Sequence, residues 1–244
     1  MKTICALAVV AGLLAISAHA AVTIHYEQNF DSLDVGEADG QDGWAVGAPA
    51  NQASTLITDA ENHDGAGQAM EVSANQEVIR NFDPKITSGV HFLSIWFQVA
   101  AVDAANNLHI YMGDEVREWN AGPVIRIGSQ SGGGFDEVGV HDGGAAQPVA
   151  PILEGQWQHI FEVIDVDAHT YDVYVDDDLV ADDFAWRNPG SHQSLGWLML
   201  GFDDGVDLIG YYDDIVFGEG DTLPWAVGVT GKLATTWASV KRAR

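Results

Sequence analysis

Seven side chains of types that bind or process polar ligands recur at alternating positions within short apolar runs. They are Trp96, Gln98, His109, Tyr111, Arg126, Glu137 and His141. Because side chains alternate along a strand, these positions point away from the apolar residues between them. If the runs lie side by side in one sheet, the seven residues share one face of it.

Three roles fit such a face. A sugar-binding groove needs an aromatic ring to stack on the sugar and planar polar side chains around it. A polysaccharide lyase would use Tyr111 or His109 as a base, while Arg126 neutralises an acidic sugar. The third role is the polar outer surface that an antiparallel sheet presents to water. The residues alone leave all three open.

The elements that would position these residues are strands. Apolar residues alternate or form short buried runs, and the connections are rich in Gly and Asp. We expect strands at 90–99, 108–112, 124–128, 137–141, 157–165, 170–176, 195–202 and 208–218. The Asp-rich segment 165–169 predicts a hairpin turn. Many short strands without helical periodicity predict an all-β fold, a two-sheet antiparallel sandwich.

The first twenty residues are typical of a secretory signal peptide. Lys2 precedes an apolar run at 4–16, and Ala18-His19-Ala20 fits a cleavage site. A buried N-terminal helix is the alternative. We predict a signal peptide at 1–20, one domain at 21–220 and a separate C-terminal segment at 221–244. Cys5 is the single cysteine and lies in the signal, so the exported chain contains no disulfide.

Charge is distributed unevenly. The chain has 36 acidic and 10 basic residues and a net charge of −26. Such a charge repels nucleic acid and anionic lipid, so we expect neither as a partner. The last twenty residues differ from the rest, since they contain Lys232, Lys241, Arg242 and Arg244 and no acidic residue.

Three motifs occur in a fixed order. Tyr-Glu-Gln-Asn-Phe-Asp-Ser begins at 26, Gly-Gln-Trp-Gln-His at 155–159 is followed by Tyr-Asp-Val-Tyr-Val-Asp-Asp at 171–177, and Tyr-Tyr-Asp-Asp-Ile occupies 211–215. Together they resemble the concanavalin A-like (laminin G-like) jelly rolls of secreted bacterial proteins, over residues 22–219. The resemblance implies a jelly-roll sandwich. It does not imply one activity, because the fold carries lectins, glycosidases, lyases and adhesive modules.

The resemblance also implies a structural Ca²⁺ ion that ties the first strand to the last. Matched by motif, its ligands are Asp31, Asp64 and Asp213, which supply the oxygens that calcium prefers. Asp213 and Asp214 alternate along a strand, so we expect only Asp213 to face the site. The loop 203–207 is a second candidate. Zinc is not expected, because the nine histidines show no paired spacing.

Catalysis has less support. Glycosidases that the chain resembles carry two or three carboxylates alternating on one strand. Here Asp172 and Asp176 share a face of one expected strand, but Tyr174 lies between them. This pattern is typical of an ordinary hairpin strand. The negative charge also disfavours the polyanions that lyases of this fold cleave. We therefore lean toward a protein that is not an enzyme.

The C-terminal segment 229–244 resembles short sorting segments of secreted bacterial proteins. As a helix it would place Leu233, Trp237 and Val240 on one side and end in basic residues, so it could contact the cell surface or a sorting machinery. A disordered tail, or one that docks on its own acidic domain, is the alternative.

Together these features predict a secreted or cell-surface protein exported by the general secretory route. We expect a non-catalytic, calcium-stabilised jelly-roll module that binds an extracellular polysaccharide, another glycan or another ligand. The alternatives are a structural or adhesive surface protein without sugar affinity, and a polysaccharide lyase or glycosidase of the same fold.

Overall fold

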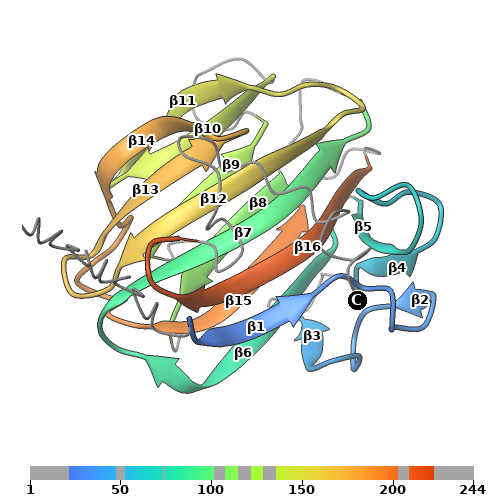
Figure 1. Cartoon of the computed structure of the whole chain (residues 1–244), viewed down its shortest axis with the longest axis horizontal. Helices are drawn as coiled ribbons and strands as arrows, with labels where there is room; N and C mark the ends of the chain where they lie inside the picture. The colour runs from blue at the N-terminus through green and yellow to red at the C-terminus, as the bar shows by residue number, and fades with distance from the viewer. Residues whose placement is uncertain are drawn as a thin grey trace, which may run out of the picture.

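The computed structural model describes residues 22–47, 53–73, 75–101, 108–114, 122–128, 136–202 and 209–222. Within these ranges the chain forms sixteen strands and no helix, in two antiparallel sheets packed as a sandwich (Figure 1). The predicted fold class is confirmed. None of the described segments is a helix long and apolar enough to cross a membrane.

The first sheet has nine strands. They are β1 (Ile24–Gln28), β2 (Gly36–Glu37), β4 (Leu56–Thr58), β5 (Ala69–Val72), β7 (Val90–Val99), β12 (Trp157–Asp165), β13 (Thr170–Val175), β14 (Asp178–Ala185) and β16 (Gly210–Glu219). Their order is β14-β13-β12-β7-β16-β5-β4-β2, and β1 also pairs with β16. The first and last strands of the described residues, β1 and β16, are therefore neighbours, as Figure 1 shows.

The second sheet has seven strands. They are β3 (Trp44–Val46), β6 (Glu77–Ile86), β8 (Leu108–Gly113), β9 (Val124–Ile127), β10 (Glu137–Asp142), β11 (Ala145–Pro151) and β15 (Leu195–Phe202). Their order is β11-β10-β9-β8-β15-β6-β3. Strands β8, β9 and β10 are consecutive neighbours, which brings the polar residues between their core positions onto one surface.

The core lies between the two sheets and follows the period of two. Leu93, Ile95 and Phe97 of β7 and Leu108 and Ile110 of β8 are at most 1% exposed and belong to one cluster. Burying a side chain of this size contributes about 1.5–3 kcal/mol. The alternation that predicted these strands from the sequence is thus the alternation that builds the core.

Several predictions lie outside the described residues. They concern the signal peptide at 1–20, the acidic loop 203–207 and nearly all of the C-terminal segment, since residues 223–244 are not described. These remain predictions from the sequence.

Candidate functional site

The structure separates the seven residues that were expected to share one face. His109 and Tyr111 lie on β8, Arg126 on β9, and Glu137 and His141 on β10, all in the second sheet. Trp96 and Gln98 lie on β7, which belongs to the first sheet. The expectation of one shared face is therefore wrong for Trp96 and Gln98, because the chain crosses from one sheet to the other between β7 and β8.

His109 and Arg126 belong to a row of four residues that lie opposite one another on neighbouring strands of the second sheet. Glu77 of β6 is opposite Gly201 of β15, Gly201 is opposite His109, and His109 is opposite Arg126. Glu77 was not predicted from the sequence. It joins the site because Gly201, on the strand between them, has no side chain to separate it from His109.

The Glu77–His109 pair is fully buried. Glu77 is 2% exposed and His109 0% exposed, and Glu77 Oε2 lies 3.6 Å from His109 Nε2. A Cβ added at Gly201 would lie 2.9 Å from this Nε2 and 2.9 Å from the carbonyl oxygen of Gln76. Contacts this short exclude a side chain at position 201, so Gly201 is what allows the pair to form.

Tyr111 adds an aromatic surface beside this row. Its ring stacks on His109 at 4.3 Å between centroids with the planes 20° apart, and the Arg126 guanidinium carbon lies 5.9 Å from the ring centre. Tyr111 also packs in a buried apolar cluster. That cluster also contains Ile79, Val124, Trp197 and Met199.

Positive charge gathers at the β9–β10 end of the row. Burial lowers the pKa of His141 to about 3, and the charges of Arg187 and Arg126 lower it further in the same direction. Burial, and then the charge of Arg126, lower the pKa of Arg187. His141 is thus neutral at pH 7. The described residues contain four Lys and Arg side chains in all, which are Arg126, Arg187, Arg80 and Lys85.

Several buried polar atoms on this surface make no hydrogen bond to another described residue. Within the described ranges they are both ring nitrogens of His109, both ring nitrogens of His141 and Oε1 of Glu77. Buried polar groups are almost always paired, because an unpaired one has lost water without replacement. We name as the polar face the set Glu77, His109, Tyr111, Arg126, His141 and Arg187. Its floor is buried, and Arg187 and the neighbouring Glu137 are half-buried at its rim.

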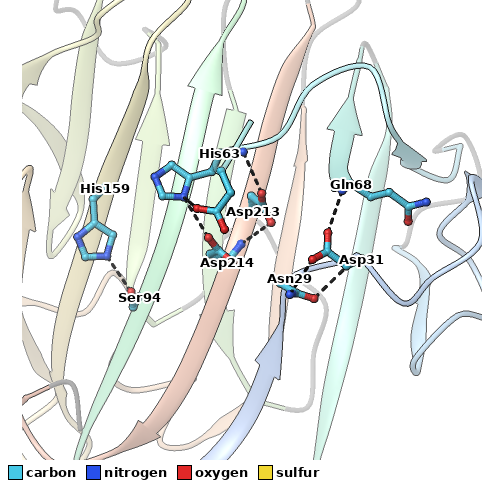
Figure 2. Close-up of polar contacts among 9 residues, drawn as sticks. Asn29, Asp31, His63, Gln68, Ser94, His159, Asp213 and Asp214 are labelled. Atoms are coloured by element: carbon cyan, nitrogen blue, oxygen red, sulfur yellow. Dashed lines mark hydrogen bonds and ion pairs between the residues drawn. The ribbon is translucent and has the colours of Figure 1, made fainter. Parts of the chain in front are cut away.

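A second group of chemically active residues lies on the first sheet. The connection 59–68, between β4 and β5, places His63 beside Asp213 and Asp214 in the middle of β16 (Figure 2). His63 Nδ1 is 3.0 Å from Asp214 Oδ2 and 3.6 Å from Asp64 Oδ1. Ligand atoms of these three residues lie within 4.8 Å of one another, close enough to hold one metal ion.

Both adjacent aspartates of β16 face this connection, which corrects the expectation that only Asp213 would. Asp213 Oδ2 accepts a hydrogen bond of 3.0 Å from the backbone N–H of His63, while Asp214 contacts its ring. The alternation fails because the pairing with β7 shifts register after Asp213 and Asp214 has a φ of 47°. A bulge of this kind redirects a side chain.

Asp31 lies at the other end of the same connection. Its Oδ1 accepts a hydrogen bond of 3.0 Å from the backbone N–H of Gln68, and Figure 2 shows it apart from His63. Of the three predicted calcium ligands, only Asp64 belongs to the group formed with His63 and Asp214. Asp213 accepts a hydrogen bond from the backbone of His63, and Asp31 accepts one from the backbone of Gln68 at the other end of the 59–68 connection.

The donor set fits a hard cation in part. The Asp64 and Asp214 carboxylates supply oxygens there, and Asn62 of the same connection has a buried Oδ1 with no hydrogen-bond partner among the described residues. Calcium binds six to eight such oxygens. The His63 nitrogen is not a calcium ligand and is of the type that binds zinc and other transition metals.

Trp96 and Gln98 of β7 contact the 59–68 connection. The Trp96 ring stacks on His63 at 3.7 Å and on His159 at 4.9 Å, and Gln98 Nε2 donates to Glu61 Oε1 at 3.4 Å. His159 shares a 2.7 Å hydrogen bond with Ser94 Oγ, and burial lowers its pKa to about 4, helped by the charge of His63. The His63 and His159 rings thus both stack on Trp96, so the Trp96 ring is not open for a sugar to stack on it.

No protein-family model matches the chain, and no curated protein sequence matches it. Solved structures do. A sialidase superposes with a TM-score of 0.56 at 12% identity over 82% of this chain, which corresponds to only 19% of the sialidase chain. This chain thus spans about a fifth of that protein.

Two smaller structures match over nearly their whole length. "Cellulose induced protein, Cip1" has a TM-score of 0.52 at 13% identity, covering 78% of this chain and 97% of its own. Domain 4 of AbnA, a GH43 extracellular arabinanase from Geobacillus stearothermophilus solved with arabinotriose, has a TM-score of 0.53 at 15% identity, covering 83% and 95%. At these identities the likeness establishes the shared β-sandwich fold.

Proposed function

We propose that the chain is an exported, non-catalytic module that binds a carbohydrate at the polar face of its second sheet. Two facts support the proposal. The fold is shared with a domain solved in complex with arabinotriose, and the first twenty residues have the pattern of an export signal. Fold alone does not assign a ligand, so the polar face has to supply the evidence for one.

The observation that carries the proposal is the set of unpaired polar atoms on that face. His109, His141 and Glu77 hold five buried nitrogen and oxygen atoms without a hydrogen bond within the described ranges. A sugar hydroxyl both donates and accepts, so it can satisfy a neutral imidazole and a carboxylate together. The depressed pKa of His141 keeps that imidazole neutral across physiological pH, which suits this role.

Aromatic and cationic groups beside these atoms complete the recognition surface. The buried Tyr111 ring stacks on His109 and fixes the orientation of that imidazole, and Arg126 and Arg187 supply planar donors near it. Because the whole chain carries −26, highly charged polyanions are repelled at a distance. We therefore propose a neutral or weakly acidic glycan as the ligand.

Binding to a glycan array and titration calorimetry test the proposal. We expect the chain to retain one class of glycan, and Arg126→Ala and His141→Ala to weaken binding by about tenfold or more, as the loss of a buried polar contact does. His25→Ala is the matched control, because His25 is an exposed histidine on β1 of the other sheet. A blank array, or equal losses in all three variants, would refute the proposal.

We also propose that a divalent cation, calcium by preference, binds beside the 59–68 connection. The oxygens of Asp64 and Asp214 support it, since carboxylates brought together repel one another unless a cation lies between them. Thermal melting with EDTA and then with millimolar Ca²⁺ or Zn²⁺ tests it, because a ligand that binds only the folded state raises the Tm. A rise with Ca²⁺ that is lost in Asp214→Asn is expected, and a rise with Zn²⁺ alone would replace calcium by a His63-bound metal.

A lyase is the second candidate, and the buried Glu77–His109 pair favours it. Glu77 lies 3.6 Å from His109, which could orient the imidazole as a base while Arg126 binds a sugar carboxylate. Such an enzyme would release unsaturated sugar ends, and Tyr111→Phe and Arg126→Ala would abolish the release. An inactive chain on a panel of polysaccharides would leave the binding module as the function.

A further inference from the structure

A groove on the outer surface of the first sheet combines an apolar floor with acidic walls. It encloses about 560 Å³ beside β12, β13 and β14. Its apolar and aromatic lining includes Val90, Val163 and Tyr174. Five carboxylates surround these groups, and no described residue of the lining is basic. The carboxylates belong to Asp165, Asp172, Asp182, Asp183 and Asp221.

The negative charge of the groove acts on the phenol at its floor. Burial raises the pKa of Tyr174, and the carboxylates of Asp172, Asp182 and Asp221 raise it further. Because Asp172, Asp182 and Asp221 all act on the Tyr174 ring, their carboxylates lie close enough together to attract one bound cation jointly. The groove thus favours an occupant that is both basic and apolar.

The chain itself contains such a segment, and it begins at the groove. Asp221 and Thr222 line the groove and are the last described residues. Residues 223–244 follow directly and contain four basic residues, no acidic residue and two tryptophans. Trp225 is three residues beyond Thr222, within about 10 Å of extended chain, and Lys232 is ten residues beyond, within about 35 Å.

We propose that residues 223–244 bind back into this groove of the same chain. The indole of Trp225 packs against Val163 and Tyr174, and the basic side chains lie among the aspartates. Because the segment is tethered at the rim, its local concentration is high and weak contacts suffice. The contacts are mostly between exposed charges, so they weaken as salt screens them. This inference concerns the first sheet and does not depend on glycan binding by the second.

Limited trypsin digestion of the exported chain tests the docking. Cleavage after Lys232, followed by mass spectrometry, is expected to be about tenfold slower at 20 mM than at 500 mM NaCl, a protection that a few exposed ion pairs can provide. A free peptide of residues 223–244 supplies the salt dependence of trypsin itself. Protection that equals that of the peptide at both salt concentrations would overturn the proposal.

Two sets of variants locate the docking site. Asp182→Asn with Asp183→Asn and Asp221→Asn removes three exposed carboxylates from the groove, and cleavage is expected to become fast at low salt. Asp34→Asn with Glu37→Gln and Glu154→Gln removes the same charge from exposed positions elsewhere and is expected to keep the protection.

Changes in the segment itself leave the folded domain untouched. Lys241→Gln with Arg242→Gln and Arg244→Gln is expected to speed cleavage at Lys232 to the rate of the groove variant. Equal protection in all variants would overturn the groove as the site. Protection that grows with protein concentration would overturn docking within one chain and indicate a second copy as the partner.

Discussion

Glu162 is a carboxylate buried in the core of the sandwich, and its removal gives a sharp test of how tightly that core is packed. It lies on β12 on the same side as Ile160 and Ile164, is 1% exposed, and neither carboxylate oxygen has a hydrogen-bond partner among the described residues. Burial raises its pKa from 4.5 to about 8. The folded protein therefore holds a proton that the unfolded chain releases.

The sign and size of the effect follow from this difference. Since the folded pKa is the higher one, the stability linked to Glu162 is fully present below about pH 4.5 and is lost as the pH rises to about 8. The rise from 4.5 to about 8, at about 1.4 kcal/mol for each pH unit, amounts to about 5 kcal/mol. Glu162→Gln removes this dependence while keeping the shape of the side chain.

Urea denaturation of both proteins between pH 5 and pH 8.5 measures the effect. We expect the free energy of unfolding of Glu162→Gln, relative to wild type, to increase by several kcal/mol across this range. The difference between the two proteins isolates Glu162, because the histidines titrate in both. Glu154→Gln, at an exposed position, is the control. A difference between wild type and Glu162→Gln that stays constant with pH would refute the burial of this carboxylate.

Three further predictions concern Gly201, Tyr171 and His159. Gly201→Ala, whose Cβ would lie 2.9 Å from His109 Nε2, is expected to lower the free energy of unfolding by about 1–3 kcal/mol in urea titrations and to reduce glycan binding with it. Tyr171→Phe removes a hydroxyl that donates at 2.6 Å to the carbonyl oxygen of His141, and a loss of about 1–3 kcal/mol in the same assay is expected from the unpaired carbonyl. The pKa of His159 falls from 6.5 to about 4 in the folded protein. The stability linked to this histidine is therefore present above pH 6.5 and lost as the pH falls toward 4. Between pH 6.5 and pH 4, the Tm of His159→Gln is expected to decrease less than that of the wild type.

The sequence predicted eight of the described strands and the fold class, because the core follows a period of two. The expected strands at 90–99 and 195–202 coincide with β7 and β15. Eight of the sixteen described strands were not among those expected, and β6 is one of them, because its second half, from Asn81 to Lys85, alternates weakly and carries several polar and charged residues. The sandwich nevertheless followed from the remaining strands.

The candidate sites were only partly predictable, for two physical reasons. Alternation tells which residues share a side of one strand but not which sheet the strand joins, and this separated Trp96 from His109. Alternation also fails at a bulge, which brought Asp214 to His63. Glu77 was missed because its partner lies two strands away. The isolated Gly201 within an apolar run was the available signal, since such a glycine often marks a close approach.

The central claim is that a glycan binds at the polar face, and NMR of ¹⁵N-labelled histidine rings tests it most directly. On titration with the glycan that the array identifies, we predict that the ring nitrogens of His109 and His141, which have no hydrogen-bond partner among the described residues, shift as the ligand pairs with them. The rings of His25 and His91, on the first sheet, are predicted to stay unchanged. Shifts confined to His63 and His159, or no shift at any histidine with bound glycan, would contradict the account.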